Sequence, residues 1–411
     1  MVKARSGRSP TRREFLYAAG QGGALLQGAG RIAAAGRPAP AGATRKIRLG
    51  VVGGGFGATF HWHEHPNCEV AAVTDLRSDR RQRLRDRYRC DFVYDSLQEM
   101  LRRAQKLDAV AVFSGAPDHV AHAAMCFERG LHVVSACPAA ITLEEAAKLK
   151  ELKEKTGLRY MMAESSYYRG ACIYARDLYQ RGGFGQLFYS EVEYYHDGGE
   201  RAKLVADKSS RLWEPDGSRS WRWGFPPMLY PTHSLGYIVG VTRERIVKVS
   251  SLGWGAAPYP PLKNNRYNNP FLNEAALMQT DRGHVVRCNV FWCVGAIEER
   301  AQWFGEKGSL YMENTGVHPD TWKDYEMSAR RIQLPEYWKG DMVPAPMRHL
   351  SGHGGSAVLI TAEFINALIE DREPAIDVYE SLAMTVPGIV AHQSSLKNGE
   401  QLSVPPLDRK A

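Results

Sequence analysis

Paired cysteines and long apolar runs are both scarce in this sequence of 411 residues. The seven cysteines include no CxxC element and no paired spacing, so neither a disulfide framework nor a cysteine-based zinc site is predicted. The weakly apolar segment 18–35 is too short and too rich in glycine to cross a bilayer stably, so we expect no membrane span. The net charge is +8, but no basic stripe is interleaved with aromatic residues, so we expect no nucleic-acid partner.

The N-terminal residues 1–44 differ from the rest of the chain. The run Ser9-Pro-Thr-Arg12-Arg13-Glu-Phe15-Leu16 resembles a twin-arginine export signal, and a Gly/Ala-rich segment and a Pro/Ala/Gly linker follow it. A disordered basic tail is the alternative interpretation. We expect residues 1–44 to be a signal and linker, and the protein to be exported by the twin-arginine route to a periplasmic or extracellular location.

Residues 46–75 have the order strand, turn, helix, strand and acid. An apolar run at 47–52 stops at small residues, and a second one at 69–74 ends in Asp75. Glycines allow a tight turn and close approach of backbone to a pyrophosphate, and the acid is placed to accept hydrogen bonds from ribose hydroxyls. We therefore predict a dinucleotide site formed by Gly53, Gly55, Phe56, Gly57, Ala58, Asp75 and Arg77. NAD is favoured because Asp75 repels a 2′-phosphate, an effect that Arg77 partly offsets, so NADP is the less favoured cofactor.

The pattern of apolar residues predicts two domains with different architectures. Residues 45–165 alternate strands with helices, which is typical of a parallel sheet. Residues 166–411 contain alternating segments typical of half-buried antiparallel strands, followed by helices at 355–370 and 378–396. The expected fold is an N-terminal α/β Rossmann domain followed by an α+β domain with an open, mostly antiparallel sheet.

Two further motifs extend the dinucleotide pattern. A predicted helix at 118–129 is opened by the run Pro117-Asp-His119-Val-Ala-His122. A predicted strand at 131–135 lies within the run Gly130-Leu-His-Val-Val-Ser-Ala136-Cys137-Pro138. With the glycine turn, this order resembles the Gfo/Idh/MocA family of glucose–fructose oxidoreductases and inositol dehydrogenases over essentially the whole chain after the leader. The resemblance implies an NAD-dependent oxidoreductase acting on sugars, and a homo-oligomer formed through the open sheet face. It places Pro117, His119, His122, Ala136, Cys137 and Pro138 at the cofactor.

The tripeptide Ala136-Cys137-Pro138 departs from the family pattern, which has Glu-Lys-Pro there. The missing lysine contacts substrate and cofactor in family members and helps to polarise the reacting oxygen. Ordinary alcohol-to-ketone chemistry is therefore in doubt. Nothing near Cys137 in the sequence marks an activated thiolate, so we interpret it as a structural thiol lining the cofactor pocket.

A second group of residues is expected to do the chemistry. Two segments, Tyr230-Pro-Thr232-His233 and Met161-Met-Ala-Glu164-Ser165, resemble the NAD-dependent, redox-type α-N-acetylgalactosaminidases of the same superfamily. Ser165 stands in place of their asparagine, and this resemblance places it at the cofactor. Leu229 stands where the wider family has an aspartate. Imidazole titrates near neutral pH, so we predict His233 as the catalytic base, with Tyr230 or Tyr167 as a further base.

Carbohydrate recognition is expected from an aromatic tract and a glycine-rich loop. Flat rings pack against the C–H faces of sugars and arginine binds hydroxyls, so Trp221 and Arg222 are candidate substrate residues beside Thr232. Gly352-His353-Gly-Gly resembles a loop of the superfamily that closes over the substrate, which adds His353. A Trp-rich core wall and a simple helix-entry turn are the structural alternatives.

Histidines at 61, 63 and 65 flank Glu64 in residues that could ligate a metal. We expect them on a helix at 56–65 that packs against the sheet, and so predict no metal. Three functions stay open: a sugar dehydrogenase, a glycosidase that forms a transient 3-keto sugar and recycles its NAD, and a non-catalytic sugar-binding protein that retains NAD.

Overall fold

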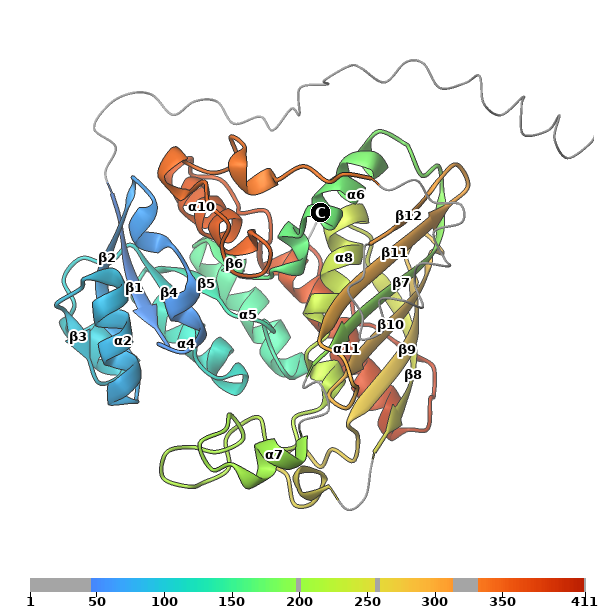
Figure 1. Ribbon diagram of the computed structural model, residues 1–411, viewed down its shortest axis with the longest axis horizontal. Coiled ribbons are helices and arrows are strands. Elements are labelled where there is room, and N and C mark those ends of the chain that lie inside the picture. Colours follow the sequence, from blue (N-terminus) through green and yellow to red (C-terminus); the bar gives the residue numbers. More distant parts are fainter. Residues whose placement is uncertain (1–45, 197–200, 256–258, 313–331, 410–411) are drawn as a thin grey trace, which may run out of the picture. The chain divides into compact units, whose positions relative to one another are not determined.

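The computed structural model describes residues 46–196, 201–255, 259–312 and 332–409 (Figure 1). The predicted export signal and linker lie outside these residues. No helix within them is both long enough and apolar enough to cross a membrane.

The first sheet is the predicted parallel Rossmann sheet. Its six strands have the order β3-β2-β1-β4-β5-β6 (Figure 1). Their bounds are β1 Ile47–Val52, β2 Cys68–Thr74, β3 Val93–Tyr94, β4 Ala109–Val112, β5 His132–Ser135 and β6 Tyr160–Met162. The strand order reverses between β1 and β4, so the carboxyl ends of these two strands flank the crevice where such folds bind ligands.

Helices α2 (Ser78–Tyr88), α3 (Leu97–Arg103), α4 (His119–Phe127) and α5 (Leu143–Thr156) connect these strands. Local sequence sets their ends. The Thr142 hydroxyl accepts a hydrogen bond from the Glu145 amide, and the Ser96 hydroxyl accepts one from the Glu99 amide. Gly157 ends α5 in the left-handed conformation at a φ of 66°.

The predicted helix at 56–65 is wrong. The chain instead forms two 3-10 turns, Phe56–Thr59 and Trp62–Glu64. Aromatic residues and histidine are mediocre helix formers, and Tyr88 supplies a competing interaction. Its hydroxyl donates to the carbonyls of Gly57 and Phe60 at 2.6 and 3.2 Å, and carbonyls in these positions would accept amide hydrogen bonds in a continuous helix. The histidines of this segment therefore do not share one helix face.

The second sheet has seven strands in the order β12-β11-β7-β10-β9-β8-β13. It is mostly antiparallel, as predicted, except that β7 and β10 pair in parallel. Its strands are β7 Leu187–Tyr195, β8 Ile246–Trp254, β9 Asn273–Thr280, β10 Val285–Phe291, β11 Glu298–Gly305, β12 Ser309–Tyr311 and β13 Leu402–Ser403. Helices α8 and α11 pack on one face of it (Figure 1).

The helices described in the second half are α6 Gly170–Gln180, α7 Arg201–Ala206, α8 Thr232–Thr242, α10 Ser356–Ile369 and α11 Val378–Leu396. One of them, α11, joins the two sheets. Helix α11 contacts α5 and β6 of the Rossmann half as well as β8 and β9, and α10 contacts β1. Every residue of α8 is buried, which holds the first turn of this helix firmly at the junction.

Candidate active site

A cleft of about 850 Å³ lies at the carboxyl ends of the first sheet. This volume falls in the range of about 300–1,000 Å³ that is usual for ligand sites. Both halves of the protein line it. Of the predicted residues, those on its wall are Gly53, Gly55, Phe56, Asp75, Arg77, His122, Ala136, Cys137, Trp221, Arg222, Tyr230, His233 and His353.

The glycine turn leaves backbone open to this cleft. Gly53 has a φ of 96°, and a Cβ there would lie 2.2 Å from the Phe113 carbonyl oxygen. Gly54 is equally tight, since its Cβ would lie 2.3 Å from the Arg80 carbonyl oxygen. A Cβ on Gly55 would meet no described atom closer than 3.8 Å and would instead occupy cleft space. The turn therefore fits a group that approaches the backbone closely, as a pyrophosphate does.

Asp75 connects the end of β2 to this turn. Its Oδ2 accepts a hydrogen bond from the Gly54 amide at 2.7 Å, and its Oδ1 accepts one from the Arg77 amide at 2.8 Å. The Arg77 side chain pairs with Asp79 at 2.9 Å. The Asp75 carboxylate thus remains fixed on the cleft wall at the place expected for a ribose contact.

The other predicted cofactor residues occupy two kinds of position. The His122 Nδ1 lies 2.9 Å from the Ser114 hydroxyl on the cleft wall. His119 is buried, and its ring nitrogens lie 2.7 Å from the Pro138 carbonyl and 3.1 Å from the Ser114 carbonyl. This places His119 behind the wall, where it holds two loop segments together. Gly57, Ala58, Pro117, Pro138 and Ser165 likewise lie outside the set of lining residues.

The decisive chemical feature of the cleft is a pair formed by Glu164 and His233. The Nδ1 atom of His233, in the first turn of α8, lies 2.6 Å from Oε1 of Glu164, which follows β6. Glu164 is fully buried and also accepts from the Ser166 amide at 2.8 Å and the Cys137 thiol at 3.1 Å. His233 is on the cleft wall. The carboxylate therefore fixes the imidazole with Nε2 left for a ligand.

Each member of this pair favours the charged form of the other. Burial disfavours both charges, but His233 and the hydrogen bonds to the carboxylate outweigh it and lower the pKa of Glu164 to about 2. Burial likewise disfavours the imidazolium, but the Glu164 carboxylate outweighs it and raises the pKa of His233. Burial and the Glu164 carboxylate raise the pKa of the Cys137 thiol, which therefore stays protonated.

Two side chains at the end of β7, Tyr194 and His196, line the cleft beside His233 and were not among the predicted residues. The ring centroid of Tyr194 lies 4.7 Å from that of His233, and the Tyr230 ring lies 5.2 Å away. Burial raises the pKa of both phenols, so both keep their protons. His196 also lines the cleft, and burial together with Arg211 and Arg222 lowers its pKa to about 4. The feature of the sequence that could have indicated these residues is their place at the end of a predicted strand, in the run Tyr194-Tyr195-His196.

A second buried polar cluster supports the His353 loop. Arg169 donates two hydrogen bonds of 3.0 Å to Glu299, which also accepts one from the Tyr237 hydroxyl at 3.0 Å. A Cβ on Gly354 would lie 3.0 Å from the Arg169 guanidinium, so the loop passes close to this cluster. His353 lines the cleft with its ring centroid 5.7 Å from that of Phe56. Its contacts span 62 and 130 residues of sequence, so no local pattern marked this cluster.

Some of the remaining predicted residues line the cleft and others do not. The Arg222 guanidinium carbon lies 4.1 Å from the Trp221 ring centroid, and both residues line the cleft. Thr232 is fully buried beneath the wall. Tyr167 lies outside the cleft lining, with its ring covered at 3.8 Å by the Arg176 guanidinium.

Comparison with known families agrees with this site. Residues 47–164 match the model of the Gfo/Idh/MocA oxidoreductase family, described as an NAD-binding Rossmann fold. Residues 296–411 match the C-terminal domain of glycosyl hydrolase 109. The chain thus combines an NAD-binding domain of the Gfo/Idh/MocA type with a C-terminal domain of the glycosyl hydrolase 109 type.

Two relatives of this chain are named as glycoside hydrolases. A glycosyl hydrolase family 109 protein of Streptomyces coelicolor is 24% identical over 409 residues, covering 89% of this chain and 84% of the relative. An alpha-N-acetylgalactosaminidase of Bacteroides fragilis is 30% identical over 172 residues, which are 40% of each chain. Similarity to such proteins thus reaches across both domains.

Solved structures share the fold of this chain. An oxidoreductase domain protein from Kribbella flavida has a TM-score of 0.71 at 18% identity, over 88% of this chain and 100% of the other. A scyllo-inositol dehydrogenase from Lactobacillus casei, solved with NAD(H) and scyllo-inositol, has a TM-score of 0.65 at 16% identity. That match covers 87% of this chain and 99% of the other.

Proposed function

We propose that this protein uses NAD to oxidise a hydroxyl group of a sugar or sugar derivative, with His233 as the base. The observation that carries this proposal is the buried Glu164–His233 pair in the same cleft as the open glycine turn. Oxidation of a hydroxyl group needs a hydride acceptor, and a bound nicotinamide would supply one. Aromatic rings and Arg222 on the same wall suit a carbohydrate.

The protein groups have separate roles in the oxidation. The Nδ1–H of His233 donates to Glu164, so Nε2 takes the proton from the sugar hydroxyl as the carbon loses its hydride. The O–H and C–H bonds break, and a C=O bond forms. The Glu164 carboxylate stabilises the resulting imidazolium. The neutral phenols of Tyr230 and Tyr194 donate hydrogen bonds to the reacting oxygen and so replace the lysine that is absent at Cys137.

A second candidate function is favoured by the match of residues 296–411 to a glycosyl hydrolase domain. In it, the oxidation is transient. The ketone acidifies the neighbouring C–H, a base removes that proton, and the aglycone leaves with the bonding electrons. Water then adds to the alkene and the hydride returns, so the net reaction is hydrolysis. His196 is neutral at pH 7, whereas burial raises the pKa of Tyr230, which favours His196 over Tyr230 as this base.

One experiment tests the proposal and separates the two candidates. The purified protein is denatured and the released material is analysed by absorbance and mass, which should identify a nicotinamide dinucleotide. Native protein is then incubated with aryl glycosides in heavy water. Transient oxidation places deuterium at C2 and releases aglycone without net NADH, whereas a dehydrogenase accumulates NADH and keto-sugar. Sugar binding with neither product would support the non-catalytic alternative.

We propose NAD rather than NADP as the cofactor, because the Asp75 carboxylate on the cleft wall repels a 2′-phosphate. We also propose export by the twin-arginine route on the strength of Arg12 and Arg13. Changing both to lysine should leave the protein in the cytoplasm in a fractionation assay, and normal export of that variant would contradict the proposal.

We propose that the exposed face of the second sheet forms a homo-oligomer interface. Large apolar side chains are exposed on its strands: Phe188, Leu252, Trp254, Leu277 and Tyr311. Patches of this kind are covered in most soluble proteins. The variant Leu277→Glu should lower the mass measured by light scattering to that of one chain, and a wild-type protein that is already a single chain would contradict this proposal.

A further inference from the structure

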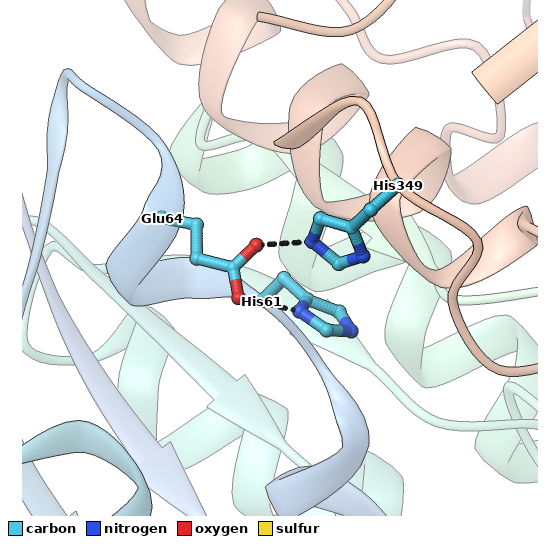
Figure 2. Close-up of side chains that lie close together, drawn as sticks. All are labelled: His61, Glu64 and His349. Atoms are coloured by element: carbon cyan, nitrogen blue, oxygen red, sulfur yellow. Dashed lines mark hydrogen bonds and ion pairs between the residues drawn. The ribbon is translucent and has the colours of Figure 1, made fainter. Parts of the chain in front are cut away.

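A cluster of two histidines and one glutamate lies outside the proposed active site (Figure 2). His61 and Glu64 come from the 3-10 segment after the glycine turn, and His349 comes from the segment before α10. The Glu64 carboxylate joins them, with 2.9 Å from Oε1 to the His61 Nδ1 and 2.5 Å from Oε2 to the His349 Nε2. The two imidazole centroids are 4.7 Å apart.

These three groups have the geometry of an open metal site. One ligand atom from each can be chosen so that all lie within 4.8 Å of one another. Zinc binds imidazole nitrogen and carboxylate oxygen at about 2.0–2.2 Å in a tetrahedral arrangement, so two ligand atoms of one ion lie about 3.5 Å apart. Movements of the ligand atoms by about 1–1.5 Å, made by rotating the side chains, are therefore enough to reach this arrangement. The side chains of His61, Glu64 and His349 are 12%, 24% and 40% exposed, which leaves a path for entry and room for water.

The two hydrogen bonds placed at the His61 Nδ1 cannot both form. This atom must carry a proton to donate to Glu64, but it also lies 3.1 Å from an Arg87 nitrogen, which needs a lone pair there. The Arg87 Nε is buried and has no partner among the described residues. The polar groups around His61 are therefore not fully satisfied by one another.

We propose that His61, Glu64 and His349 bind a divalent transition-metal cation, with Zn²⁺ as the preferred ion. Imidazole ligands favour zinc and its neighbours over magnesium or calcium, and three protein ligands leave one position for water. This proposal reverses our prediction of no metal, which assumed a helix at 56–65. The ion would join the segment after the glycine turn to the loop that carries His353 into the cleft. The role of the ion would thus be structural, since it would hold these two segments together beside the proposed active site.

Metal-free full-length protein titrated with Zn²⁺ in a calorimeter tests this proposal. We expect one equivalent to bind. The variants His61→Gln, Glu64→Gln and His349→Gln should each weaken binding by about 100-fold or more, because each removes one of three ligands. Co²⁺ should give visible absorption in the wild type that is lost in His349→Gln. Since His349 is the most exposed ligand, that variant is the one least at risk of misfolding.

Two matched variants make the test specific. His63 is a neighbouring histidine 3.7 Å from Glu64 that lies outside the cluster, so His63→Gln should bind Zn²⁺ like the wild type. Arg87→Gln removes a nearby positive charge and should tighten binding. The proposal is overturned if the wild type binds no Zn²⁺. Equal affinities of folded His349→Gln and His63→Gln, with circular dichroism as the check of folding, would also overturn it.

Discussion

His233 and Glu164 meet at 2.6 Å although one begins a helix of the second half and the other follows the last strand of the Rossmann sheet. This contact places a buried carboxylate behind an imidazole that faces the cleft. It holds an oriented imidazole in the cleft that the glycine turn and the aromatic side chains line.

The pH dependence of activity should report this pair. A base must be unprotonated, so kcat/KM should rise with pH through the pKa of His233, which lies above its ordinary value of 6.5. Glu164→Gln removes the carboxylate that raises the pKa of His233, whereas burial still lowers it. The rise of kcat/KM should therefore occur at lower pH in this variant. The rate should also fall by about 10²-fold or more. The measurement is a pH–rate profile of both proteins.

A control for that profile exists elsewhere in the chain. Glu244 and His284 form another buried pair, at 3.1 Å, and neither lines the cleft. Glu244→Gln should leave the acidic limb of the profile unchanged. A shift as large as that of Glu164→Gln would show that the limb does not report His233.

Two glycines of the turn should respond differently to alanine. Gly53→Ala places a Cβ 2.2 Å from a carbonyl oxygen at a φ of 96°, so its free energy of unfolding should fall by about 1–3 kcal/mol or more. Gly55→Ala meets no such obstacle and should keep its stability while losing NAD affinity. Thermal denaturation and NAD titration of both variants check this. Equal stability of the two would contradict the geometry of the turn.

Asp75 should decide between the two nicotinamide cofactors. Asp75→Ala should weaken NAD binding by about 10-fold or more and should not weaken NADP binding, because the carboxylate accepts from the 2′-hydroxyl of NAD and repels the 2′-phosphate of NADP. Asp75→Asn keeps the shape of the side chain and serves as the control for the hydrogen bond to the Gly54 amide. Calorimetry with each cofactor measures both effects. If Asp75→Ala bound the two cofactors as the wild type does, the preference would come from elsewhere.

Local patterns were enough to predict most of the fold. Some features act through near neighbours in the chain, so the structure they form can be predicted from the local sequence. Examples are the apolar runs of β1 and β2 and the capping residue Thr142. The prediction of a helix at 56–65 was wrong because Tyr88 is more than 20 residues away in the sequence, and its hydroxyl donates hydrogen bonds to two carbonyls of that segment. The short strand β3 and the edge strand β13 carry too few residues to show a period.

The site was predictable only where a motif marked it. His233 and Tyr230 stood in a recognisable run, and the structure places both in the cleft. The partner role of Glu164 depends on a contact across 69 residues, and Glu299 meets Arg169 across 130, so no local pattern encodes either. His349 meets Glu64 across 285 residues, which is why the histidine segment gave no sign of a third ligand.

The most direct test of the central claim is the turnover rate of His233→Ala on any sugar substrate that the wild type converts. Loss of the base should lower the rate by about 10²–10⁴-fold while NAD affinity stays nearly unchanged, because His233 acts on the hydroxyl proton. Both the dehydrogenase and the glycosidase routes require this result. A His233→Ala protein that turns over substrate at the wild-type rate would contradict both.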